Sequence, residues 1–205
     1  MINRRALLIS GAVAAASPVL AQQPEATRID LADGAMREAL LLPGIFRLGA
    51  RDGAAALVEF FDYNCPWCRY AAPEIEALLK RDPKFKLILV NYAVLGAPSV
   101  LAGKVAVALA MESPEKYPAF HREMMAIKGV AGGDEALAVA KRLGVDVDAL
   151  TETANLDVVT AALRASADFG DRNGLTATPS WLAGRSAYLG YMPPAQMRAI
   201  VAQRA

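Results

Sequence analysis

Two cysteines, Cys65 and Cys68, are the only ones in the sequence, and two residues separate them. A thiolate is a good nucleophile, and a close pair of thiols can exchange a disulfide with another molecule. A structural disulfide stabilises a fold mainly by closing a long loop of the unfolded chain. A bridge between residues three apart closes almost no loop, so the spacing favours redox chemistry over a structural bridge.

Metal binding is the competing use of such a pair. Structural zinc takes four protein ligands, whereas the chain offers one cysteine pair and a single histidine, His121, far along the sequence. We therefore expect no zinc site and no cofactor. A Cu(I) site on the two thiolates, with a methionine or His121 as a further ligand, stays open as a function of another class. His121 itself is expected on the surface of a helix.

The cysteines lie where a strand is predicted to end and a helix to begin. Residues 54–62 form an apolar run rich in aromatic side chains, typical of a buried strand. From Cys65 onward apolar side chains recur at helical spacing, at Ala72, Ile75, Leu78 and Leu79. The free N–H groups at a helix start favour negative charge, which lowers the pKa of a cysteine there. Pro66 suits the first helical turn because it has no N–H to leave unpaired.

The order strand, C-x-x-C pair, helix resembles the thioredoxin superfamily, and in particular its DsbA-like branch. Glu59 lies six residues before Cys65, where the superfamily has a buried acid. Pro73 lies eight residues after it, where the active-site helix is commonly kinked. Thr178-Pro179 precedes a strand-like run, where the family has a cis-proline loop. The resemblance extends from about residue 57 to the end of the chain.

The resemblance implies a role for each of these residues. Cys65 would be the attacking thiolate, and Cys68 the buried thiol that resolves the mixed disulfide. Glu59, on a strand buried on both faces, would exchange the proton of Cys68 through water, unless the strand is an edge strand and the carboxylate is solvated. Thr178-Pro179 would have a cis peptide bond and present backbone to an extended substrate, the alternative being a trans proline that opens a strand.

Aromatic residues around the pair are expected to contact substrate. Pro66 and Trp67 lie between the cysteines, and Trp67 with Tyr63 and Trp181 would form an apolar rim, although Trp181 is better explained as a core residue. The Pro-Trp dipeptide departs from the Pro-His of the best-known periplasmic oxidants. Trp67 cannot stabilise a thiolate by charge, so strongly oxidising character does not follow from the motif.

The fold class expected is α/β, a thioredoxin-like fold with an inserted helical domain. We expect a signal peptide at residues 1–21, an N-terminal segment at 22–50, a thioredoxin-like domain at 51–97 and 174–205, and a helical insertion at 98–173. Strands are predicted at residues 45–48, 85–92, 179–183 and 187–191. Helices are predicted at residues 35–42, 99–111, 114–127, 134–143, 146–172 and 193–203.

The first residues are typical of an export signal. Arg4 and Arg5 form a basic head, residues 6–19 are apolar, and residues 19–21 suit a signal peptidase. A membrane anchor is the alternative, but the apolar run is short for a bilayer. The pair of arginines also resembles a twin-arginine signal, so Sec and Tat export are both open. Cleavage after Ala21 removes two of the 22 basic residues and none of the 21 acidic ones, which leaves a net charge of −1 and no basis for nucleic-acid binding.

These features together predict an exported thiol–disulfide oxidoreductase in the periplasm, not embedded in the membrane once mature. Its partners would be exported proteins that contain cysteines and a membrane redox partner that reoxidises it. The same chemistry in the other direction, as an isomerase or reductase kept in the dithiol form, is the nearest alternative. A thioredoxin-fold scaffold with incidental cysteines is a further one.

Overall fold

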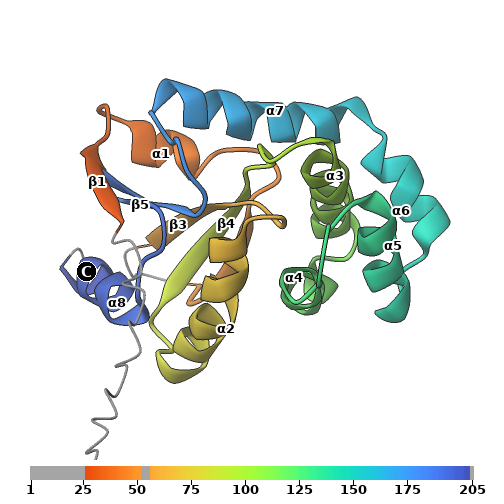
Figure 1. Ribbon diagram of the computed structural model, residues 1–205, viewed down its shortest axis with the longest axis horizontal. Helices are drawn as coiled ribbons and strands as arrows, with labels where there is room; N and C mark the ends of the chain where they lie inside the picture. Colours follow the sequence, from red (N-terminus) through yellow and green to blue (C-terminus); the bar gives the residue numbers. More distant parts are fainter. Residues whose placement is uncertain (1–25, 52–55, 204–205) are drawn as a thin grey trace, which may run out of the picture.

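The computed structural model describes residues 26–51 and 56–203, so the predicted signal peptide lies outside the described residues. In chain order the elements are β1 (Thr27–Asp30), α1 (Ala35–Ala39), β2 (Phe46–Gly49), β3 (Ala56–Phe61), α2 (Pro66–Arg81), β4 (Lys86–Asn91), α3 (Ala97–Glu112), the 3-10 helix η1 (Pro114–Lys116), α4 (Tyr117–Met125), α5 (Gly133–Arg142), α6 (Val147–Ala154), α7 (Asp157–Arg172), β5 (Ser180–Ala183), β6 (Ser186–Leu189) and α8 (Pro194–Ala202). Figure 1 shows a mixed sheet with helices on both faces and further helices beside it, which confirms the α/β class.

The strand that leads to the cysteines lies inside the sheet. The six strands of the described residues have the order β1-β6-β5-β3-β4-β2. β3 is parallel to β4 and antiparallel to β5. It reads Ala-Leu-Val-Glu-Phe-Phe, and every residue after the first is buried, as expected for a strand covered on both faces. The alternative of an edge strand for this segment is therefore excluded.

Side chains of β3 alternate between the two faces of the sheet. Val58 and Phe60 pack with residues of α1 and α7, and Phe169 of α7 stacks on Phe60 with ring centroids 5.1 Å apart. Phe61 belongs to the larger cluster on the opposite face, which α2 and α8 cover (Figure 1). Glu59 shares the face of Phe61. A carboxyl group therefore points toward the helix that begins at the cysteines.

The chain between β4 and β5 is helical, as predicted, but one boundary was not foreseen. The sequence predicts a single helix over residues 146–172, whereas α6 ends at Ala154 and α7 begins at Asp157. Leu156 between them has an extended backbone, with φ −65° and ψ 147°. Its carbonyl accepts from the N–H of Val159 at 3.1 Å and so starts the new helix. The prediction is wrong here because apolar periodicity continues across the break.

Residues 26–51 supply both edge strands of the sheet. The helix predicted at residues 35–42 and the strand predicted at 45–48 are confirmed as α1 and β2, each shifted or shortened by a few residues. β1 was not predicted. Ile29 is its one apolar side chain, and its extended conformation follows from antiparallel pairing with β6, with Ile29 opposite Ala187.

Candidate active site

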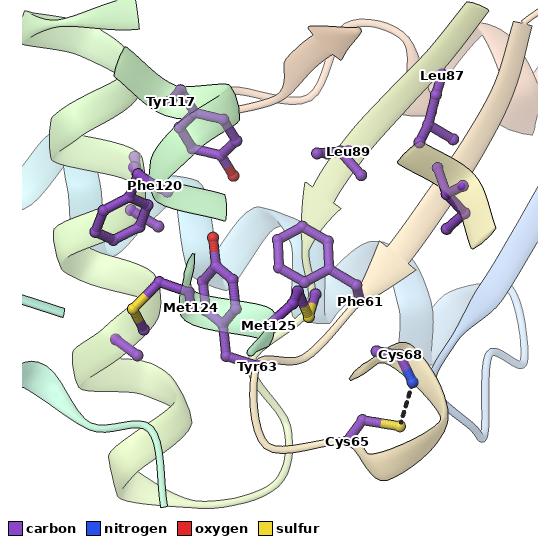
Figure 2. Close-up of a cluster of buried hydrophobic side chains, with 14 of the residues drawn as sticks. Phe61, Tyr63, Cys65, Cys68, Leu87, Leu89, Tyr117, Phe120, Met124 and Met125 are labelled. Carbon is purple, nitrogen blue, oxygen red and sulfur yellow. Dashed lines mark hydrogen bonds between the residues drawn. The ribbon is translucent and has the colours of Figure 1, made fainter. Parts of the chain in front are cut away.

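Cys65 caps the N-terminus of α2, as the sequence predicts. Its backbone is extended (φ −78°, ψ 120°), and its Sγ accepts a hydrogen bond from the N–H of Cys68 at 3.4 Å, drawn as a dashed line in Figure 2. Pro66 takes the first helical position. Both cysteines are free thiols here, and Cys68 lies one turn along the helix, fully buried.

The two thiols have opposite electrostatic environments. The pKa of Cys65 is lowered to about 6, first by the hydrogen bond from the side chain of Cys68, with burial acting in the opposite direction. Hydrogen bonds from the Thr178 side chain and from the backbone N–H groups of Cys68 and Trp67 lower it further. Burial raises the pKa of Cys68 well above its usual range. Near neutral pH the pair therefore holds one thiolate, on Cys65, and one thiol, on Cys68.

Glu59 is buried in the middle of β3 on the face of the cysteines. Its pKa is raised to about 8, mainly by burial and then by the negative charge of Cys65. Its Oε1 has no hydrogen-bond partner among the described residues. Its charge in turn raises the pKa of Cys68. Glu59 is therefore a neutral carboxylic acid near pH 7 that interacts electrostatically with both cysteines and carries a proton.

The loop before β5 brings backbone to the reactive sulfur. The Thr178-Pro179 peptide bond is cis, as predicted. The Cys65 thiol donates to the carbonyl oxygen of Thr178 at 3.0 Å. Two segments more than a hundred residues apart in the sequence thus meet at one thiol.

Trp67 and Tyr70 are exposed aromatic residues near the pair, with 36% and 46% of their surfaces exposed. The ring of Trp67 contacts Tyr70 and Tyr191, with centroids 5.9 Å apart in each case. The expectation that Tyr63 belongs to an apolar rim is wrong, because Tyr63 is buried against Phe61 (Figure 2). Trp181 is a core residue, as the sequence suggested.

The expectation of a surface position for His121 is also wrong. Its ring is buried, stacks on Tyr117 with an interplanar angle of 15°, and lies with Nδ1 3.3 Å from the hydroxyl of Tyr63. Burial lowers the pKa of His121 to about 3, so the ring is neutral. The helical spacing of apolar residues around it was the available signal, because Tyr117, Phe120 and Met124 place His121 on their inward face.

Two further polar residues of the site were missed. Asp62, fully buried, and Asn64 stand just before Cys65 and hydrogen-bond segments near Val94 and Ala131. No spacing rule within the motif points to partners so distant in sequence.

The described residues also bear on metals and membranes. Within residues 26–51 and 56–203, no three His, Cys, Asp or Glu side chains are grouped so that they could hold a metal ion. In the same residues, no helix combines the length and the apolar character needed to cross a bilayer.

Comparison with known proteins identifies the family. Residues 56–202 match the DSBA-like thioredoxin domain. A thioredoxin-like oxidoreductase from Silicibacter pomeroyi DSS-3 is similar with a TM-score of 0.75 and 31% identity, over 81% of this chain and 95% of that one. The thiol-disulfide exchange protein alpha-DsbA2 from Wolbachia pipientis has a TM-score of 0.75 and 25% identity, over 82% and 90% of the two chains.

More distant structures share the fold alone. The catalytic domain of Proteus mirabilis ScsC has a TM-score of 0.73 and 23% identity, over 83% of this chain and 94% of its own. A search of curated protein sequences finds no match. With the family match, the thioredoxin-like fold and the paired thiols in place, the chain belongs to the DSBA-like thioredoxin domain family and is a DsbA-like thiol–disulfide oxidoreductase.

Proposed function

We propose that this protein is an exported disulfide donor, which passes its Cys65–Cys68 disulfide to cysteines of other exported proteins. The observation that carries the proposal is the asymmetry of the pair: a thiolate-forming Cys65 at a helix start and a buried, protonated Cys68. A membrane redox partner would restore the disulfide. The periplasm is the proposed location, on the strength of the export-signal pattern in the first residues.

The transfer follows from these two environments. A substrate thiolate attacks Sγ of Cys65, the bond to Cys68 breaks, and Cys68 leaves with the electron pair. Because burial raises its pKa, the Cys68 thiolate takes up a proton, and the neutral carboxyl of Glu59 supplies it. A second substrate thiolate then attacks the mixed disulfide and releases Cys65 as a stable thiolate. The substrate loses two electrons, and the protein gains them as a dithiol.

The direction of transfer depends on how far the reduced form is stabilised. With a pKa of about 6, Cys65 near pH 7 is present as roughly ten thiolates for each thiol. That ionisation favours the dithiol form about tenfold over a pair with ordinary thiols, which raises the reduction potential by about 30 mV. Stabilising the reduced form makes the disulfide a better oxidant, so the low pKa supports donation over reduction.

Substrate would bind as an extended segment beside the thiol. The Thr178 carbonyl, which accepts the hydrogen bond of the Cys65 thiol, and the adjoining Pro179 offer backbone beside the thiol for such a segment. Pro66 and Trp67, which follow Cys65 in the chain, are both exposed. We assign these four residues to substrate contact and Glu59 to proton transfer.

The deciding experiment is the reduction potential of the domain, equilibrated with glutathione buffers and followed by tryptophan fluorescence. Trp67 lies between the two cysteines, so its emission should change with their redox state. A potential near about −120 mV supports a disulfide donor, and one near about −270 mV supports the isomerase or reductase alternative. A Trp67→Phe variant is the control, since the signal should fall to that of the buried Trp181.

A further inference from the structure

A buried carboxylate stands three residues before Cys65 and holds a second loop. Asp62 Oδ2 accepts from the backbone N–H groups of Val94 and Leu95, at 3.0 Å each. Its Oδ1 accepts from the hydroxyl of Ser99 at 2.7 Å and from the N–H of Asn64 at 2.8 Å. A buried charge is costly unless donors surround it, and here four do. The loop after β4 is thereby fixed to the end of β3.

Asn64 fixes a third segment in the same way. Its Nδ2 donates to the carbonyl of Ala131 at 2.9 Å, and its Oδ1 accepts from the N–H of Ala131 at 2.8 Å. The side-chain amide thus pairs with one backbone unit through both of its polar atoms. Nδ2 also donates to Ser99 Oγ at 3.0 Å. Because Ser99 in turn donates to Asp62, the hydrogen bonds of Asn64 and Asp62 form one network. On the other side of the cysteines, Arg69 Nη1 donates to the carbonyl of Gly129 at 2.8 Å.

The segments held by these bonds present aliphatic side chains to solvent. Val94 is 45% exposed, Leu95 51% and Val130 63%. Exposed side chains of this kind gain free energy by turning inward, at roughly 25 cal/mol per Å² of apolar surface buried. Loops without regular structure would yield to that tendency unless their backbone were fixed. The hydrogen bonds of Asp62 and Asn64 supply that constraint.

The fixed loop after β4 shares a hollow with Thr178, which contacts the reactive sulfur. Val94, Leu95 and Thr178 are among the residues that line this hollow of about 450 Å³. The carbonyl of Thr178 accepts the hydrogen bond of the Cys65 thiol, so Thr178 both lines the hollow and contacts that thiol. A side chain flanking the cysteine of an extended substrate would enter this space.

We propose that Asp62 and Asn64 are positioning residues, which hold residues 94–95 and 129–132 as an aliphatic wall against which a substrate polypeptide binds next to Cys65. This inference rests on the proposed function. Neither side chain hydrogen-bonds the sulfur of Cys65, whose partners are Cys68, Thr178 and the backbone of Trp67. The two side chains therefore act on the binding of a polypeptide, and variants of Asn64 and Ser99 leave in place the Asp62 backbone, which hydrogen-bonds the sulfur of Cys68.

The test compares a polypeptide with a small thiol. The oxidised protein is reduced either by a peptide with two cysteines among leucines or by glutathione, and tryptophan fluorescence follows the reaction. For Asn64→Ala and Ser99→Ala we expect the half-saturating peptide concentration to rise about tenfold, with the limiting rate and the glutathione rate constant within about twofold of wild type. Hydrogen exchange at the Ala131 amide should accelerate in Asn64→Ala.

Asp146→Ala is the matched control. It also removes side-chain acceptors of backbone N–H groups, those of Asp148 and Ala149 at 3.0 and 3.2 Å, but at the start of α6. It should leave both substrates unaffected. The variants of Asn64 and Ser99 avoid removing the buried Asp62 itself, which would put folding at risk.

Three results would overturn the inference. One is faster hydrogen exchange at the Ala131 amide together with an unchanged half-saturating peptide concentration. The wall would then be mobile without any effect on peptide binding. Another is an equal loss toward glutathione and peptide, which would place the effect on the thiol. The third is unchanged hydrogen exchange at the Ala131 amide in Asn64→Ala, which would mean that the side chain of Asn64 does not hold this loop. A wild-type protein that reacts with glutathione and leaves the peptide thiols unoxidised would instead refute the proposed function.

Discussion

At the scale of single residues, the reactivity of Cys65 depends first on its neighbour Cys68. The side-chain hydrogen bond from Cys68 is the largest cause of the low Cys65 pKa. Cys68→Ala removes the donor, so the Cys65 pKa should rise from about 6 toward the ordinary value of a cysteine. Cys68→Ser keeps an O–H donor at the same place and should retain most of the lowering. The ultraviolet absorbance of the thiolate, titrated against pH, measures both. Equal pKa values in the two variants would mean that the helix start alone sets the pKa.

The raised pKa of Glu59 predicts that the free energy of unfolding falls as pH rises. Its folded pKa of about 8 lies above the ordinary 4.5, so the folded state retains a proton that the unfolded state loses. The contribution of Glu59 to the free energy of unfolding is therefore fully present below about pH 4.5 and is lost as pH rises toward 8. In Glu59→Gln this fall should vanish, a difference of up to about 4 kcal/mol over the window, since one pKa unit corresponds to about 1.4 kcal/mol.

Denaturant unfolding of the oxidised protein across this range is the measurement, because the disulfide keeps Cys65 from titrating. Burial still raises the Glu59 pKa in that form, but the contribution of the Cys65 charge is absent, so the fall should be smaller than in the dithiol protein. The exposed Glu115 offers the control, and Glu115→Gln should keep the wild-type slope. A slope that survives in Glu59→Gln would assign the pH dependence to another group.

How far the site could be predicted from the sequence depends on where each residue finds its partners. Cys65 and Cys68 act through their own helix start, and local patterning reveals that. Glu59 could be placed because its strand is apolar on both sides of it. The hydrogen-bond roles of Asp62 and Asn64 are fixed by backbone groups 32 to 67 residues away, which no local pattern encodes.

At the scale of elements, the same distinction holds. Long helices and the inner strands carry strong periodicity and were predicted. β1 exists because β6 offers a partner edge, and the break between α6 and α7 depends on the conformation of Leu156. Tertiary contacts decide both features, so single-sequence periodicity could not show them.

The packing of α7 on the sheet gives a prediction at this scale. A Cβ at Gly170 would lie 2.5 Å from the ring of Tyr92, whose hydroxyl is anchored to the carbonyl of Leu175 at 2.9 Å. Alanine is ordinarily the better helix residue by about 1 kcal/mol, but the clash should outweigh that gain. We expect Gly170→Ala to lower the free energy of unfolding by about 1–3 kcal/mol, measured by denaturant titration.

Relief of the clash provides the check on this explanation. Tyr92→Leu removes the ring, so adding Gly170→Ala to that variant should no longer destabilise it and should follow helix propensity instead. A Gly170→Ala effect of the same size in both backgrounds would show that the ring of Tyr92 is not the obstacle.

At the scale of the whole molecule, redox state and folding are linked through Cys65. In the dithiol protein its pKa is about 6, against an ordinary value of 9, so its ionisation stabilises the folded state above about pH 6 and that contribution is lost as pH falls through 6. The disulfide form has no such thiol, and a bridge across so short a loop constrains the unfolded chain little.

The reduced protein should therefore gain stability relative to the oxidised protein between about pH 5 and pH 7, by about 1 kcal/mol after allowance for solvent screening at Cys65. Burial, the larger cause of the raised Glu59 pKa, acts in both folded forms, so Glu59 should contribute little to the difference. Denaturant unfolding of both forms at several pH values measures the gap, and Cys65→Ser, which has no thiolate at this position, should lack the gain. Because a disulfide that destabilises its own protein is readily given away, a gap that widens in favour of the oxidised form would reverse the inferred direction of transfer.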